Sequence, residues 1–155
     1  MEQTSWLPLI KEESKTLLDY LRLPQSSQQT FLDETIEILS KCGDPQLPRN
    51  TEIGLVFGYV QSGKTMSFTL LTALAKDNGY RIIIIIAGIS TNLVAQSFTR
   101  LERDLRMDSR VDLQWLSFKN PKASDSTITS QIETALEEWN DETFPEEERK
   151  TILLQ

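Results

Sequence analysis

One eight-residue segment restricts the folds open to this chain more than any other stretch. It runs from Gly58 to Thr65 and reads GYVQSGKT. Gly58 and Gly63 let the backbone turn tightly and approach a ligand, so that successive N–H groups can point at negative charge. The spacing G-x-x-x-x-G-K-[ST] is typical of a loop that wraps phosphates between a strand and a helix. We therefore predict a phosphate-binding loop at 58–65.

The two polar side chains that end the loop have distinct predicted roles. Lys64 would reach the β- and γ-phosphates of a nucleotide, and it is the candidate catalytic residue. Thr65 would offer its hydroxyl to Mg²⁺, which takes few protein ligands. Leu55, Val56 and Phe57 form an apolar run before the loop, and 66–76 reads as a helix after it. This is the strand, loop and helix order that the motif requires.

Composition narrows the class of protein. A chain of 155 residues with 39% hydrophobic residues can form one sizeable core, and its net charge of −7 argues against a free-standing electrostatic DNA binder. Cys42 is the only cysteine and there is no histidine, which excludes an internal disulfide and disfavours a Cys/His zinc site. The longest apolar run, 82–87, is too short to cross a bilayer. We expect a cytoplasmic protein with no membrane partner.

The first 50 residues predict a helical region and a linker. Pro8 can open a first helix that ends at Leu23 and Pro24, and a second helix is expected from about Ser27 to Leu39. The prolines of 44–50 indicate a linker into a nucleotide-binding core at 51–155.

Further strands and helices alternate along that core. The β-branched run 81–87 predicts a strand that is buried on both faces, and 111–118 predicts a less buried one. Helices are expected at 91–105 and around 128–139, and 151–154 looks like the start of another buried strand. The pattern predicts an α/β fold of three layers with a mainly parallel sheet and an N-terminal helical pair at one side.

Nucleotide hydrolysis also needs an acidic residue to hold the metal. No apolar strand of this sequence ends in Asp or Glu. We expect the acid to lie beyond Gln155, so that the domain is incomplete and the chain binds nucleotide rather than hydrolysing it. The alternative is a short protein that has lost hydrolysis and kept binding.

The region 81–122 is locally positive, with seven basic residues against four acids. Arg100, Arg103 and Arg106 recur every three residues, but acids lie between them. This interleaving favours a solvated, salt-bridged helix over a track for phosphates.

Three segments together resemble a known family. Gly58–Thr65, the strand 81–87 and the following GISTNLVAQ at 88–96 resemble the start of the superfamily-two helicase-like ATPases. The YVQS insert of the loop is similar to that of endonuclease ATPases from bacterial restriction-modification and defence loci. The resemblance covers about 54–105, a third of the chain.

The resemblance implies a P-loop fold of the RecA-like type, with ATP and Mg²⁺ as ligands and DNA as a partner through a larger assembly. It implies that the chain stops before the acidic end of the Walker B strand. In the corresponding second motif, Ser90, Thr91 and Gln96 are the candidate contacts to nucleic acid, with Ile89 in place of the usual proline. The candidate nucleotide-binding residues are Gly58, Gln61, Ser62, Gly63, Lys64, Thr65 and Met66.

Two other functions fit the sequence. A small P-loop kinase would match the length but should show an arginine-bearing lid, which we do not find. A non-hydrolysing ATP-binding module could use the N-terminal helices to bind a partner. DNA-stimulated hydrolysis would separate the helicase-like ATPase from both.

Overall fold

The computed structural model describes residues 6–47, 52–56, 64–86, 91–110 and 114–155; at 64, 65 and 91–94 it describes the backbone alone. By its internal contacts the chain divides into two compact units, residues 1–79 and 80–155. The predicted boundary near residue 50 does not coincide with this division.

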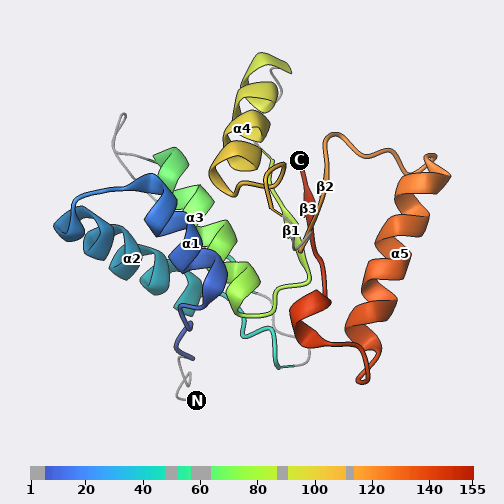
Figure 1. Ribbon diagram of the computed structural model, residues 1–155, viewed down its shortest axis with the longest axis horizontal. Coiled ribbons are helices and arrows are strands. Elements are labelled where there is room, and N and C mark those ends of the chain that lie inside the picture. Colours follow the sequence, from blue (N-terminus) through green and yellow to red (C-terminus); the bar gives the residue numbers. More distant parts are fainter. Residues whose placement is uncertain (1–5, 48–51, 57–63, 87–90, 111–113) are drawn as a thin grey trace. The chain divides into compact units, whose positions relative to one another are not determined.

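In its described residues the first unit contains three helices, α1 (Glu12–Leu21), α2 (Gln25–Ser40) and α3 (Lys64–Asp77). Both α1 and α2 pack against α3, as Figure 1 shows. The helical pair is thus confirmed, although α1 begins four residues after Pro8 and leaves Ile10 exposed outside the helix.

The core of this unit is centred on α3. Leu70, Ala73 and Leu74 of α3 are fully buried, and α2 contributes Leu32 and Leu39. An isolated helix of ten residues such as α1 is marginal in water, so its stability depends on what it packs against.

The second unit holds a parallel sheet whose strands are β1 (Ile82–Ile84), β2 (Trp115–Phe118) and β3 (Thr151–Leu154). Among the residues that the structure describes, the sheet order is β1-β3-β2, and both pairs are parallel. Ile152 of the central strand stands opposite Ile82 on one side and Leu116 on the other. The strand expected at 151–154 is therefore confirmed.

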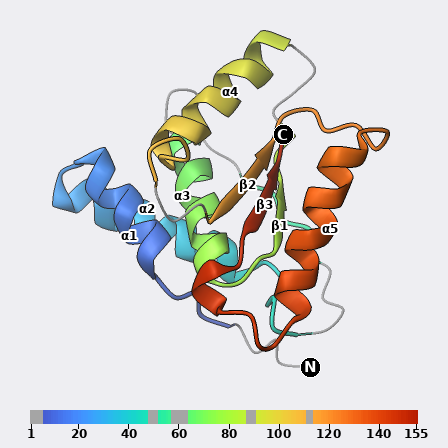
Figure 2. The ribbon, with the colours of Figure 1, turned by 45° about the vertical axis from the view of Figure 1, so that its right-hand side comes forward.

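Helices lie on both sides of this sheet. The chain passes from β1 through α4 (Thr91–Asp104) to β2, and then returns through α5 (Ser126–Asn140) and the short 3₁₀ helix η1 (Glu146–Glu148) to β3. Since the two crossovers run in opposite directions, right-handed connections place α4 and α5 on opposite faces. Figure 2 shows this arrangement. The α/β class is confirmed, with an observed sheet of three strands.

Two predictions about strands are corrected. Residues 52–56 have no regular structure, so the strand expected at Leu55 and Val56 is not formed there, and Phe57 lies outside the described residues. The short strand β1 is not buried on both faces: Ile82 is 40% exposed and Ile84 is 64% exposed. Ile82 and Ile84 are two residues apart and therefore share one face of the strand, so it is this face of β1 that is exposed, while Ile83 on the other face is half-buried.

None of the helices described here has both the length and the apolar character needed to span a membrane.

Candidate functional site

The predicted phosphate site falls at the start of α3. This helix begins at Lys64, so Lys64, Thr65 and Met66 form its first turn. The first N–H groups of a helix have no partner within it, and they carry the positive end of the helix dipole. The side chain of Met66 is half-buried. The other candidate nucleotide-binding residues lie outside the described residues, namely Gly58, Gln61, Ser62 and Gly63.

The candidate nucleic-acid contacts lie at the start of α4. Thr91 is its first residue, Gln96 is exposed on it, and Ser90 lies outside the described part of the chain. Further along this helix Arg103 forms an ion pair with Asp104 at 2.8 Å. Arg103 is exposed in this pair and Asp104 is buried, so the helix carries one of the expected salt bridges, although it is not fully solvated.

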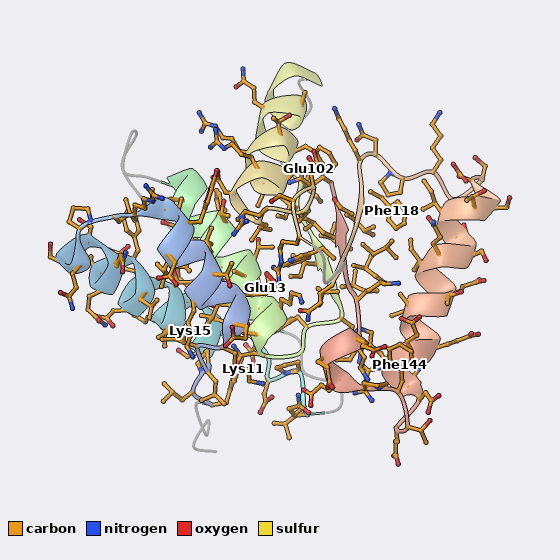
Figure 3. The ribbon with its side chains drawn as sticks, viewed as in Figure 1. Lys11, Glu13, Lys15, Glu102, Phe118 and Phe144 are labelled. Carbon is orange, nitrogen blue, oxygen red and sulfur yellow. The ribbon has the colours of Figure 1, made fainter. Side chains whose placement is uncertain are left out.

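The opposite end of α3 carries a site that the sequence reading did not identify. Asp77 is the last helical residue and is buried. Its Oδ2 accepts the backbone N–H groups of Lys11 and Ser14, both at 3.0 Å, and its Oδ1 accepts that of Glu13 at 2.9 Å. One carboxylate thus satisfies three donors at the start of α1, near the labelled Lys11 and Glu13 of Figure 3.

The next residue extends this set of contacts. Asn78 accepts the N–H of Leu9 at 2.8 Å and donates to the carbonyl of Leu9 at 3.0 Å. Its amide also donates to the carbonyl of Leu74, which anchors it to its own helix at 2.7 Å. We call the contacts of Asp77 and Asn78 with residues 9–14 the latch.

A glycine ends α3 directly after the two latch residues, Asp77 and Asn78. Gly79 has φ of 87°, and its N–H donates to the carbonyl of Lys76 at 2.9 Å, so it ends α3 in a left-handed turn. A Cβ at this position would lie 3.2 Å from Nε2 of Gln46 and would be strained by the positive φ. The sequence indicated a turn here, and the glycine provides it.

The latch is one of the main contacts that hold α1 against α3. The buried residues of α1 are Glu13, Ser14 and Leu17, so a single apolar side chain is fully buried. Burying one leucine stabilises by about 1.5–3 kcal/mol, and one hydrogen bond to a charged group contributes about 1.5–3 kcal/mol. With three such bonds, the contribution of the carboxylate is of the same order as that of the apolar burial by Leu17 and the half-buried Leu18 and Leu21. The N-cap residue Lys11 makes no side-chain hydrogen bond of its own to the helix.

In the second unit, Trp139 of α5 joins segments that are far apart in sequence. Its indole N–H donates to the carbonyl of Lys150 at 2.8 Å, just before β3. The guanidinium carbons of Arg81 and Arg149 lie 5.6 and 5.7 Å from the ring centroid. Arg81 also donates to Asn140 at 2.8 Å. This cluster ties the end of α5 to the residues that precede β1 and β3.

A second contact of this unit links α4 with the end of β2. The Lys119 ammonium lies 5.6 Å from the ring centroid of Phe98. Partial burial and, to a lesser degree, the charge of Asp108 raise the pKa of Glu102, while Lys119 opposes this shift. Within the described residues, no group of three or more His, Cys, Asp or Glu side chains could hold a metal ion.

The latch could not be found from local sequence signals. Asp77, Asn78 and Gly79 follow a helical pattern and predict a turn, whereas the partners of Asp77 stand 63 to 66 residues earlier in the chain. A buried carboxylate becomes recognisable as a helix cap only when the two segments are seen together.

Comparisons of the chain with protein-family models, with curated proteins and with solved structures found no match.

Proposed function

We propose that this chain is the ATP-binding portion of a DNA-directed, helicase-like P-loop ATPase of the kind associated with restriction-modification endonucleases. The observation that carries the proposal is the coincidence of the G-x-x-x-x-G-K-[ST] segment with the first residue of α3. The described part of α3 runs from Lys64, and the motif predicts that a helix follows the loop at this position. Its first N–H groups and positive dipole end favour a bound anion.

The chemical roles follow from the residue types. Lys64 supplies a cation to the β- and γ-phosphates, and Thr65 supplies a hydroxyl to the Mg²⁺ that accompanies ATP. The parallel sheet between α4 and α5 supports an α/β nucleotide-binding fold, because such folds bind ligands at the carboxyl ends of their strands. DNA is the proposed partner through Ser90, Thr91 and Gln96, and Gln96 is exposed.

The decisive variant is Lys64→Ala. Calorimetry should show that wild type binds ATP in the presence of Mg²⁺ and that Lys64→Ala binds it at least ~10-fold more weakly, since a charge-assisted phosphate contact is worth about 1.5 kcal/mol or more. Lys15→Ala removes the same charge from an exposed position of α1 and is the matched control. Equal ATP affinity of wild type and a folded Lys64→Ala variant would exclude the assigned site.

Phosphate release separates the remaining functions. Turnover that rises on addition of single- or double-stranded DNA supports a DNA-directed ATPase. ATP binding without turnover supports the non-hydrolysing module, while phosphate transfer to a small acceptor supports a kinase.

A further inference from the structure

The two ends of α3 make different kinds of contact. Its first turn contains the proposed phosphate ligands Lys64 and Thr65, and its last residue is Asp77 of the latch. A 14-residue α-helix is about 21 Å long and continuous in its hydrogen bonding, so order or displacement at one end affects the other. α3 therefore connects a proposed ligand site with the docking of α1.

The hydrogen bonds of the latch are sensitive to a displacement of the end of α3. The three hydrogen bonds to Asp77 are 2.9–3.0 Å long, and such bonds weaken steeply when the angle at the hydrogen falls below about 120°. The apolar contact of α1 is small, because Leu17 is its one fully buried apolar side chain and Leu18 and Leu21 are half-buried. The three hydrogen bonds to the carboxylate are therefore a substantial part of what holds its start. The docking of α1 thus depends on whether the end of α3 is formed and in place.

We propose that the latch couples the docking of α1 to nucleotide occupancy at the start of α3. The coupling rests on the proposed function, because it takes ATP as the ligand of the first turn. Nucleotide contacts restrain the first turn of α3, the helix transmits this restraint to Asp77, and the carboxylate then keeps α1 docked. By thermodynamic linkage, a docked α1 strengthens nucleotide binding by the same factor.

Hydrogen exchange of the full chain tests the latch without any ligand. The variant Asp77→Asn keeps the shape of the side chain but replaces one acceptor oxygen with an amide donor. We expect exchange at residues 11–21 to accelerate at least ~10-fold, because one charge-assisted hydrogen bond corresponds to about that factor. Exchange of α2 should change much less. Asp19→Asn removes the same charge from an exposed position of α1 and should leave exchange unchanged.

The same measurement with Mg²⁺ and ATP tests the coupling. In wild type, ATP should slow exchange at residues 11–21 by about 5-fold or more, which is the lower end of typical coupling. In Asp77→Asn the ATP effect on α1 should disappear, and calorimetry should show ATP affinity reduced by the same factor. A latch that was merely structural would not produce this agreement between two independent measurements.

Each negative result contradicts a different part of the proposal. Unchanged α1 exchange in Asp77→Asn overturns the latch itself. ATP binding that leaves α1 exchange unaltered overturns the coupling and leaves the proposed function intact. Absence of ATP binding to wild type overturns the proposed function and the coupling with it.

A second variant serves if Asp77→Asn does not fold. Asn78→Ala removes the two contacts to Leu9 and keeps the carboxylate, and unchanged exchange at 9–14 in that variant overturns the proposal.

Discussion

At the scale of single residues, one residue type can have different roles, because the surroundings of its side chain differ. Asp77 is an acid at a helix C-terminus, where the helix dipole disfavours negative charge. Its three backbone donors from the start of α1 offset this, since the positive end of one helix meets a carboxylate at the end of another. The same residue type at Asp125 caps its own helix.

The environment of Cys42 leads to a prediction about pH. Partial burial, and next the negative charge of Glu52, raise the pKa of this thiol. A raised pKa lowers the thiolate fraction at any given pH, so a disulfide reagent should react with Cys42 several-fold more slowly than with an unstructured cysteine peptide at about pH 8. The rate should keep rising with pH after that of the peptide has levelled off. Equal rates for protein and peptide at every pH would contradict the shift.

At the scale of elements, helix starts differ in how far away their stabilising partners lie. α5 begins with a local cap, because Asp125 accepts the N–H groups of Thr127 and Ile128 at 3.0 and 3.2 Å. α1 and α2 have no such side-chain cap from their N-cap residues. The helix expected around 128–139 could therefore be predicted from nearby residues, whereas the start of α1 was placed too early.

The cap of α5 gives a test at this scale. Asp125→Ala should lower the free energy of unfolding by about 0.5–2 kcal/mol, since two backbone donors lose their side-chain acceptor and a helix N-terminus loses a nearby negative charge. Asp125→Asn keeps an acceptor and serves as the matched control, with a smaller loss. Urea unfolding followed by circular dichroism measures both, and equal stability of the alanine variant and wild type would show that the cap contributes nothing.

At the scale of the whole molecule, contacts between distant segments define each unit. In residues 1–79 the helices α1 and α2 pack against α3, and the latch joins the end of α3 to residues 9–14. In residues 80–155 a parallel sheet is formed from strands separated by crossovers, and Trp139 links α5 to the residues before two of those strands. Each unit thus depends on partners that are far apart along the chain.

Trp139 offers the test of this linkage. Trp139→Phe keeps an aromatic ring near the two arginines but removes the donor to the carbonyl of Lys150. We expect a loss of about 1–3 kcal/mol in the free energy of unfolding, because a partly buried acceptor loses its partner. Denaturant unfolding of the full chain measures it, and a change smaller than ~0.5 kcal/mol would mean that the indole N–H has no stabilising role.

The sequence by itself determined the features that local chemistry controls. Apolar periodicity and turn residues predicted the five α-helices of the described residues, the α/β class and the strand at 151–154, and the segment after the loop at 58–65 was predicted to be helical over 66–76. These signals lie within a few residues of what they describe. The functional assignment of that segment remains a proposal for the nucleotide and DNA experiments.

Only the tertiary structure decided the features that depend on distant partners. Ile82 and Ile84 share an exposed face of β1, and the apolar composition of the strand does not reveal which of its faces is covered. The role of Asp77 follows from donors more than 60 residues earlier in the chain. Periodicity reports which faces of an element are apolar, but a carboxylate acquires its hydrogen-bonding partners only when folding brings separate segments within 3 Å.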